Sequence, residues 1–239
     1  MAKVNLNSSL YWLPRIEAAG LPSPATVIIR YNHAKAVAVL EGAASYQARR
    51  VVTGIRQAID TITGLPAFIR TDLASAKHNG PNDYLLKGTS REEILTVFWR
   101  TVEATEMKLW LSPFQPRAVL VRQFLHLNTS FRAFGGHPIA REWRYFSQDA
   151  LLVCRHFYWP EEAIKFWENL PPPQGWRKQL KALAQPPPPA LDKLAARAAQ
   201  ALSPGAWSID FAQDRQGKWW LIDCALAADS WHPDHQEGG

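Results

Sequence analysis

Residues 140–159, AREWRYFSQDALLVCRHFYW, constrain the fold of this chain more than any other stretch. Glu142 and Arg144 alternate with Trp143 and Tyr145, which is the period-two pattern of a half-buried strand with its aromatic side chains in a core. A strand of this kind normally sends scattered Lys, Thr or Ser to water. This strand instead carries a carboxylate and a guanidinium side by side, so its charged face needs a specific explanation.

The sequence predicts that this strand returns on itself as a hairpin. A turn at Ser147-Gln148-Asp149 leads into the apolar run 150–154, and Arg155 and His156 follow. We expect the two adjacent strands to offer Glu142, Arg144 and Arg155 to one pocket. The alternative is a surface salt-bridge ladder, which contributes little to stability.

The size and composition of the chain fit one large globular domain or two small ones that share a cleft. The chain has 239 residues, of which 47% are apolar, so it can bury a sizeable core. It carries 27 Lys and Arg against 21 Asp and Glu, a formal net charge of +6. This mild excess fits a phosphate-bearing ligand as well as it fits nucleic acid.

The cysteines and the absence of long apolar stretches indicate a compartment. Cys154 and Cys224 each lie in an apolar run, so neither a disulfide framework nor a cysteine metal site is expected, and a reducing compartment is favoured. The start of the chain lacks a signal-peptide core, and no stretch approaches a membrane span. We expect a cytoplasmic protein without membrane contact.

Three elements can be assigned in the first half of the chain. Residues 26–30, TVIIR, follow a proline breaker and predict a strand. Residues 45–62 carry apolar side chains at helical spacing and end before Gly64-Leu65-Pro66. Residues 90–107 begin with a capping box, SREE, ahead of an apolar stripe. The last two segments are expected to be helices.

A polar loop lies between these two helices. Residues 67–71, AFIRT, and residues 84–86 predict short strands, and the loop 72–80 that joins them carries small residues and Lys77. A hairpin of this kind can fold over phosphates, with Lys77 as a point charge and backbone N–H groups as donors. The alternative is an ordinary exposed hairpin loop.

Residues 118–125, AVLVRQFL, have the character of a fully buried strand that is interrupted by Arg122 and Gln123. A buried guanidinium and a buried amide cost free energy unless both find partners. We therefore expect a satisfied polar pocket at this point. A structural hydrogen-bond network is the alternative.

Two proline runs mark an irregular segment later in the chain. Residues 171–173 and 186–189 flank a basic segment that contains Trp176 and Lys181. Since polyproline is stiff and solvated, we expect a surface linker, with contact to nucleic acid or substrate as the alternative. The neighbouring helices are expected over residues 161–170 and 191–202.

The chain closes with a hairpin whose two strands each carry a carboxylate. Residues 207–211 and 218–223 form the strands, and each apolar run ends on an aspartate, Asp210 or Asp223. Two carboxylates on one face of paired strands can hold Mg²⁺ between protein and phosphate oxygens. The alternative is that the aspartates only mark strand ends at turns, where Asp is common.

Taken in order, FIRTDLASAKH, VLVRQF, REWRYF and SIDFAQD…GKWWLID resemble the motifs of ATP-grasp proteins over about residues 67 to 226. The resemblance is to a divergent ligase-like branch found in phages and bacteria, and to the eukaryotic ATP-grasp chaperones of translation initiation factor assembly. It implies an α+β fold of two lobes, with mainly antiparallel sheets, that clamp ATP between them. The lobes would comprise residues 67–125 and 126–239, after an N-terminal segment 1–66 and with a proline-rich insertion at 171–189.

The resemblance also implies roles for individual residues. Arg70 and Lys77 would meet the phosphates, and Gln123 with the backbone of Leu125 would read the adenine edge. The implied nucleotide-binding residues are Arg70, Lys77, Arg122, Gln123, Phe124, Leu125, Glu142 and Arg144. The implied catalytic residues are Lys77, Arg144 and Arg155. The implied Mg²⁺ ligands are Asp210 and Asp223.

The implied activity is an ATP- and Mg²⁺-dependent ligase that converts a carboxylate into an acyl phosphate and joins it to an amine. Positioning and charge neutralisation would carry the phosphoryl transfer. Many relatives place Asn where this chain has Ala225, so either Asp229 compensates or metal binding is weaker. Arg70 stands where many relatives have Lys, and Arg also pairs with phosphate. Two alternatives remain: a non-catalytic nucleotide-dependent assembly protein, and a nucleic-acid-binding protein. No motif in the sequence identifies the acceptor substrate, and peptides and proteins are among the candidates.

Overall fold

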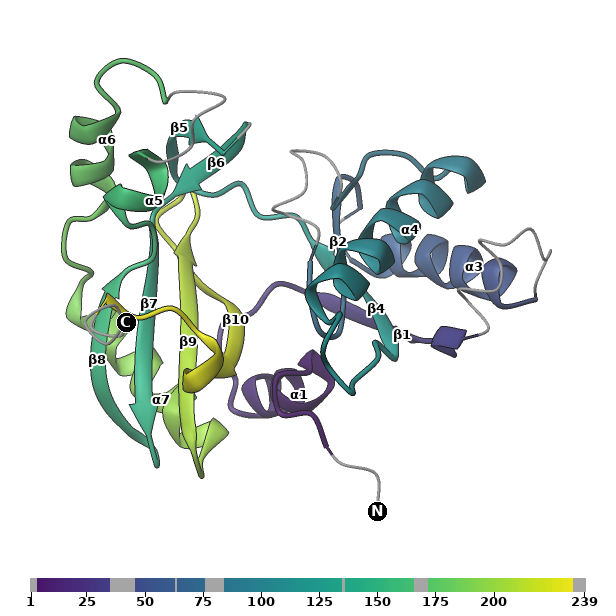
Figure 1. Cartoon of the computed structure of the whole chain (residues 1–239), viewed down its shortest axis with the longest axis horizontal. Helices are drawn as coiled ribbons and strands as arrows, with labels where there is room; N and C mark the ends of the chain where they lie inside the picture. The colour runs from purple at the N-terminus through teal and green to yellow at the C-terminus, as the bar shows by residue number, and fades with distance from the viewer. Residues whose placement is uncertain are drawn as a thin grey trace. The chain divides into compact units, whose positions relative to one another are not determined.

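The computed structural model describes residues 4–34, 46–62, 64–75, 84–134, 136–165 and 172–233, and it divides into two compact units (Figure 1). Unit 1 comprises residues 1–23, 126–133 and 138–239, and unit 2 comprises residues 24–125 and 134–137. In the part of the chain that is described, no helix has the length and apolar character needed to cross a membrane.

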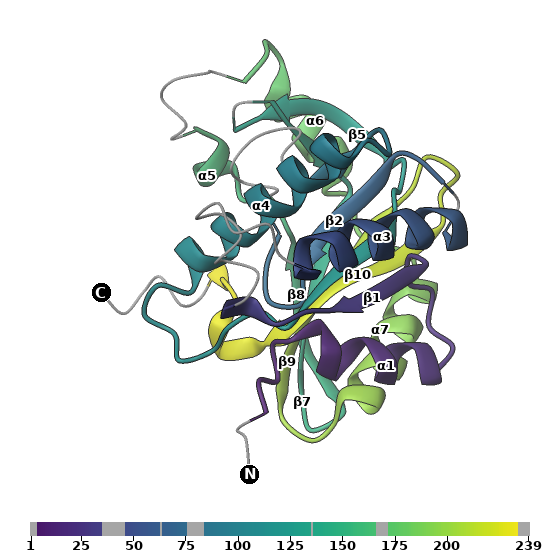
Figure 2. The same ribbon diagram turned by 90° about the vertical axis from the view of Figure 1, so that its right-hand side faces the viewer.

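Unit 2 is a four-stranded antiparallel sheet in the order β1-β4-β2-β3, and helices α3 and α4 cover one of its faces (Figures 1 and 2). The strands and helices expected from the sequence are present here, but the strand expected over residues 118–125 ends at Gln123. The elements are β1 (Thr26–Arg30), α3 (Tyr46–Thr61), β2 (Ala67–Thr71), β3 (Leu85–Leu86), α4 (Arg91–Lys108) and β4 (Ala118–Gln123).

The core of unit 2 lies between this sheet and the two helices. Val51 and Ile55 of α3 pack with Val97 and Phe98 of α4, and Val121 of β4 belongs to the same buried cluster. Helix α4 begins where the sequence predicts, because the hydroxyl of the N-cap Ser90 accepts a hydrogen bond from the Glu93 N–H at 3.1 Å.

Unit 1 is built on a second four-stranded antiparallel sheet, in the order β10-β9-β7-β8, with a separate two-stranded sheet β5-β6. Its strands are β5 (Thr129–Ala133), β6 (His137–Ala140), β7 (Glu142–Gln148), β8 (Leu151–Phe157), β9 (Ala206–Gln213) and β10 (Trp219–Leu226). Its helices are α1 (Ser9–Ala18), α5 (Glu161–Lys165), α6 (Trp176–Leu183), α7 (Pro189–Leu202) and the 3₁₀ turn η1 (Ala227–Asp229).

Helix α7 covers one face of the unit 1 sheet. The Tyr145 hydroxyl on β7 donates a hydrogen bond to Asp192 of α7 at 2.8 Å. Tyr11 of α1 stacks on Trp207 of β9 with ring centroids 5.9 Å apart, and Trp207 is fully buried. We call this the helix-covered face and the opposite side of the same sheet the acidic face, after the aspartates that it carries.

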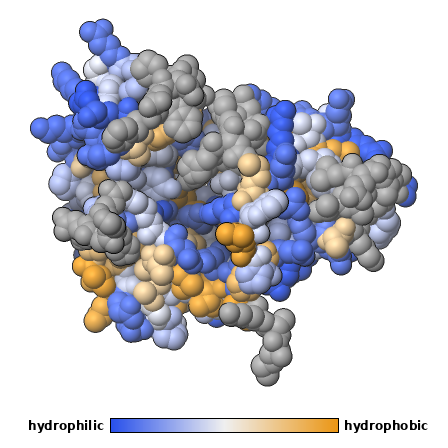
Figure 3. All heavy atoms as spheres, viewed as in Figure 1, coloured by the Kyte–Doolittle hydropathy of each residue, from blue (hydrophilic) through white to orange (hydrophobic). Residues whose placement is uncertain are grey.

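Polar and apolar side chains are mixed on the molecular surface shown in Figure 3. Strand β8 lies at the edge of the sheet and exposes two apolar side chains, Leu151 and Val153, which are 73% and 67% exposed.

The turn before β8 is displaced from its expected place at residues 147–149. Asp149 and Ala150 form it, both with positive φ, which matches the right-handed twist of a two-residue hairpin.

The expected surface linker at Trp176 to Lys181 is wrong. These residues form helix α6, with Trp176, Leu180 and Leu183 buried on one side and Arg177, Lys178 and Lys181 exposed. The Trp176 ring lies 6.3 Å from that of Phe131 on β5. Apolar burial at helical spacing therefore outweighs the proline runs on either side. Helix α5 occupies the start of the helix expected over residues 161–170, and residues 166–170 lie outside the described residues.

Candidate functional site

Strand pairing in unit 1 brings a cation and two carboxylates together on the acidic face. Arg144 of β7 lies directly opposite Asp210 of β9, and Asp210 lies opposite Asp223 of β10. Directly paired residues of antiparallel strands project to the same side of a sheet. The three side chains therefore form a row across three strands, and neither aspartate lies at a strand end, which excludes the simple turn-marker interpretation.

Arg144 and Asp210 form a bidentate ion pair. Arg144 Nε and Nη2 donate to the two carboxylate oxygens of Asp210, each at 2.7 Å, and the side chains are only 12% and 8% exposed. The surface-ladder alternative is therefore wrong for Arg144. Burial alone would lower the pKa of Arg144, but the charge and hydrogen bonds of Asp210, together with Tyr158 and Asp223, raise it.

Asp223 reaches the acidic face because of a β-bulge. From Trp219 to Leu221 strand β10 pairs regularly with β9, but the register shifts by one residue before Asp223. Without this shift Asp223 would lie opposite Ile209, whose side chain projects to the helix-covered face. A one-residue slip exchanges the two faces of a strand, and bulges are frequent beside functional sites.

A second bulge removes Arg155 from the expected pocket. The register of β7 and β8 shifts between Phe146 and Ser147, so that Arg144 pairs with His156 and Tyr145 pairs with Arg155. The prediction that Arg155 shares a pocket with Glu142 and Arg144 is therefore wrong. Regular pairing from the observed turn at Asp149 and Ala150 would have placed Arg155 opposite Arg144.

Arg155 instead binds helix α7 on the helix-covered face. Arg155 Nη1 donates to Asp192 Oδ1, and the Tyr145 hydroxyl donates to the same oxygen. Burial would raise the pKa of Asp192, but these two hydrogen bonds and the Arg155 charge lower it. Arg155 thus links helix α7 to the edge strand β8, and it makes no contact with the row of Arg144, Asp210 and Asp223.

An aromatic and histidine cluster that was not expected from the sequence lies next to Arg144. His156 stacks on Phe146 at 5.8 Å between centroids, and Trp231 and His232 pack edge-on against His156 at 5.1 and 5.6 Å. The Trp231 carbonyl also accepts a hydrogen bond from Arg144 Nη1 at 3.4 Å. The only available signal was the position of His156 directly after Arg155, which becomes informative once the bulge is known.

The protonation of His156 should affect stability. Burial lowers its pKa most; the Phe157 carbonyl opposes this, and Arg144 and His232 lower the pKa further, with a small opposing effect of Asp210. The folded protein therefore binds this proton less tightly than the unfolded chain does. The stabilisation is fully present above the unfolded pKa near 6.5 and is lost as the pH falls from there through the folded pKa.

We expect the urea midpoint to fall between pH 7.5 and pH 5, and to fall less in His156→Phe, which keeps a ring against Phe146. The comparison of variant and wild type removes the contribution of the other histidines. An equal fall in both proteins would show that His156 does not contribute.

The donor set of the acidic face fits a hard divalent cation. Asp210 and Asp223 supply carboxylate oxygens, and Mg²⁺ usually takes one or two protein carboxylates and completes its shell with water and substrate phosphates. An ionised carboxylate has about four acceptor positions, so the pairing with Arg144 leaves Asp210 capacity for a cation. Within the described residues no cluster of three or more His, Cys, Asp or Glu is arranged to hold a metal.

Asp229, the expected substitute for the missing Asn, has a structural partner. Its Oδ2 accepts a hydrogen bond from the Asn7 side chain at 2.7 Å, and Asn7 Oδ1 accepts one from the Leu226 N–H at 2.7 Å. These bonds join the N-terminal segment to the end of β10.

The residues expected to bind nucleotide in unit 2 divide between the two faces of its sheet. Arg70 and Arg122 are 5% and 4% exposed and lie on the face turned away from α3 and α4, since they alternate with the core residues Ile69 and Val121. Gln123 projects to the opposite side, and its Oε1 accepts a hydrogen bond from the Ala25 N–H at 3.4 Å.

The loop that carries Lys77 is described only in part. Lys77 lies outside the described residues, and the loop is visible as far as Ser75. Within that part Asp72 is 1% exposed, and its Oδ1 accepts hydrogen bonds from the N–H groups of Arg117 and Ala118 at 2.8 and 3.0 Å. Asp72 therefore fixes the start of β4. Phe124 and Leu125 follow β4 and are partly buried.

Comparison with known proteins gives the fold. No protein-family model matches the chain, and no curated protein matches its sequence. Among solved structures, C-terminally truncated Cdc123 from Schizosaccharomyces pombe gives a TM-score of 0.60 at 14% identity, covering 98% of this chain and 90% of that chain. D-cycloserine synthetase DcsG gives a TM-score of 0.52 at 11% identity, covering 92% of this chain and 62% of that one.

These similarities confirm the α+β class with antiparallel sheets, and the fold is the ATP-grasp fold that the sequence motifs resemble. Within this fold, the chain is similar to Cdc123. A second structure of Cdc123 from Schizosaccharomyces pombe gives a TM-score of 0.57 at 16% identity and covers 92% of this chain and 82% of that chain.

Proposed function

We propose that the protein binds ATP with Mg²⁺ and uses it to activate a carboxylate for ligation to an amine or similar nucleophile. The observation that carries the proposal is the bulge in β10, which places Asp223 beside Asp210 and Arg144 on one face. A purely structural hairpin would not need a register change that collects charge of both signs in a row. The similarity in fold to a D-cycloserine synthetase is consistent with ligase chemistry.

The proposal assigns a role to each expected site residue except Arg155. Arg70, Arg122 and Lys77 are assigned to the nucleotide, and Gln123, Phe124 and Leu125 to the adenine end. Glu142 is assigned to nucleotide binding, Arg144 to the transferred phosphoryl group, and Asp210 and Asp223 to Mg²⁺. Arg155 is not assigned a catalytic role, because its guanidinium is bound to Asp192 on the other face.

Two displacements make up the reaction. A substrate carboxylate oxygen attacks the γ-phosphorus, the bond to the β,γ-bridging oxygen breaks, and ADP leaves. The nucleophile then attacks the acyl carbon, loses its proton and releases inorganic phosphate. Bound Mg²⁺ would neutralise charge on the phosphate oxygens. Arg144 is suited to hold the phosphoryl oxygens because a guanidinium has five N–H donors, of which the bonds to Asp210 and to the Trp231 carbonyl use three.

A second function, nucleotide-dependent binding without ligation, is favoured by one observation. Ala225 stands where many ATP-grasp ligases have a metal-binding Asn, and Asp229 is held by Asn7. The fold similarity to Cdc123 is compatible with either function. The nucleic-acid alternative is not proposed further, because the ring expected to stack on bases, Trp176, is buried against Phe131.

Release of ADP separates the two proposed functions. The purified protein is incubated with ATP, Mg²⁺ and a pool of carboxylic acids and amines, and ADP is measured with and without the pool. We expect ADP release to rise at least about tenfold when the acceptors are added, because acyl-phosphate formation needs a carboxylate. ATP binding without any acceptor-dependent release would favour the binding protein over the ligase.

A further inference from the structure

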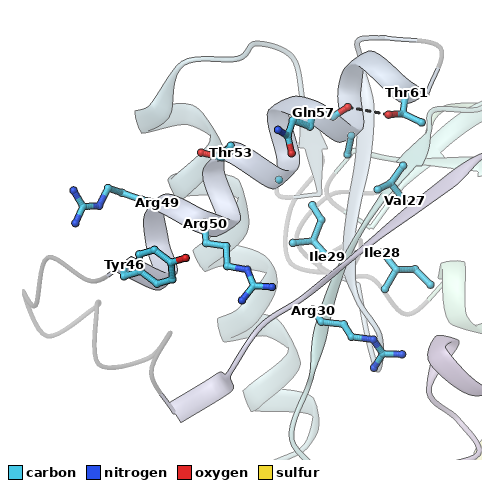
Figure 4. Close-up of a pocket in the computed structure, with 12 residues that line it drawn as sticks. Val27, Ile28, Ile29, Arg30, Tyr46, Arg49, Arg50, Thr53, Gln57 and Thr61 are labelled. Carbon is cyan, nitrogen blue, oxygen red and sulfur yellow. Dashed lines mark hydrogen bonds between the residues drawn. The ribbon is translucent and has the colours of Figure 1, made fainter.

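Unit 2 has a groove that no part of the proposed ATP chemistry uses. It lies along β1 and α3, encloses about 810 Å³, and is open to solvent (Figure 4). Residues 27–30 of strand β1 line one side of the groove, and residues of helix α3 from Tyr46 to Thr61 line the other side.

The strand side of the groove is a sheet edge. Strand β1 is the first in the order β1-β4-β2-β3, and within the described residues it pairs only with β4. The Tyr31 N–H donates to the Arg117 carbonyl at 3.0 Å, and the Ala25 carbonyl accepts from the Gln123 N–H at 2.8 Å. Since antiparallel pairs alternate, the N–H and C=O groups of the intervening residues 26, 28 and 30 point away from β4, toward the open edge.

The helix side presents a polar stripe beside that edge. Tyr46, Arg50, Thr53 and Gln57 follow one another at spacings of four, three and four residues, which places them on one side of α3. Figure 4 shows the Arg50 side chain extending from α3 toward β1. A Cβ added to Gly54 would lie 3.1 Å from the Ile29 side chain, so helix and strand approach closely behind the stripe.

The positive charge of the groove indicates which kind of ligand it would bind. Three of the lining residues are the arginines Arg30, Arg49 and Arg50, and no lining residue is acidic. An open strand edge presents alternating backbone donors and acceptors, which an extended peptide matches with its own N–H and C=O groups. A nucleic acid would satisfy the arginines but has no such backbone pattern.

We propose that β1 and α3 form a docking groove for an extended acidic peptide segment of a partner protein, which adds to the sheet as a strand beside β1. A segment of about five residues spans the roughly 17 Å length of β1. Main-chain hydrogen bonds to residues 26, 28 and 30 give affinity, and acidic side chains next to Arg50 give selectivity. The proposal is independent of ATP binding.

Fluorescence anisotropy with a capped, labelled seven-residue peptide of alternating Glu and Thr tests the groove in the full-length protein. We expect binding that weakens at least about tenfold in Arg50→Glu, while Arg91→Glu, the same charge change at an exposed position at the start of α4, weakens it less than about twofold. A matching Lys and Thr peptide should bind at least about tenfold more weakly than the Glu peptide.

Strand addition is distinguished from simple charge attraction by the backbone. Ile28→Pro removes one N–H that points to the open edge and leaves the pairing with β4 intact, so it should weaken binding at least about tenfold. A fully N-methylated peptide offered to the wild-type protein should lose affinity equally, which keeps the test valid if Ile28→Pro folds poorly. Any of three results would overturn the proposal. The first is absence of binding at millimolar peptide, and the second is binding of the N-methylated or Lys peptide that equals binding of the Glu peptide. The third is Arg50-dependent binding of a single-stranded oligonucleotide in preference to the peptide.

Discussion

Replacing Asp210 with alanine is expected to lower the free energy of unfolding by about 3–5 kcal/mol. Both guanidinium hydrogen bonds from Arg144 to this carboxylate are 2.7 Å long, and the Arg144 side chain is only 12% exposed. Without Asp210 a buried positive charge loses its bidentate partner and cannot be neutralised, because arginine stays protonated. The loss is measured as the change in the urea unfolding midpoint at pH 7.5.

A double variant separates loss of the pair from loss of packing. Arg144→Met with Asp210→Leu removes both charges and keeps apolar volume, so it should recover most of the lost free energy. Glu162→Ala, at an exposed position of the same unit, serves as the control for a removed carboxylate and should cost about 1 kcal/mol or less. If Asp210→Ala cost no more than this control, the ion pair would not stabilise the fold.

Replacing Asp223 with alanine is expected to reduce Mg²⁺-dependent release of ADP at least about 100-fold, because the metal supplies several kcal/mol of charge stabilisation in phosphoryl transfer. Asp223 is partly exposed, and its Oδ1 accepts a hydrogen bond from the N–H of Cys224 at 3.1 Å. The stability cost should therefore be small, about 1 kcal/mol. ADP release is measured at saturating ATP over a range of Mg²⁺ concentrations.

Glu162→Ala provides the matched control for this measurement. Glu162 is an exposed carboxylate on α5 of the same unit, and its removal should change ADP release less than about twofold. If Asp223→Ala released ADP at the wild-type rate, the assignment of Asp223 to the metal would be wrong even though the ATP-grasp fold would stand.

Local patterns predicted most elements because each carries its own signal. The helix over residues 45–62 and the strand 26–30 follow from apolar spacing, and the start of α4 follows from the cap at Ser90. Helix α6 was missed because its proline flanks suggested solvent exposure, whereas burial of Trp176 and Leu180 depends on a sheet that is distant in sequence.

The candidate site was harder to predict because it depends on strand register. The residue types were named from the sequence, but two single-residue bulges decide which of them share a face. One brings Asp223 beside Asp210, and the other exchanges Arg155 for His156 next to Arg144. A bulge has no strong local sequence signal, since it is set by how both strands of a pair pack.

Titration calorimetry of the purified protein with ATP, with and without Mg²⁺, tests whether the protein binds ATP together with the metal. We expect saturable binding of ATP that tightens at least about tenfold when Mg²⁺ is present, and we expect Asp223→Ala to remove this dependence on Mg²⁺. Absence of ATP binding, or ATP binding that is unchanged by Mg²⁺ in the wild-type protein, would contradict this expectation.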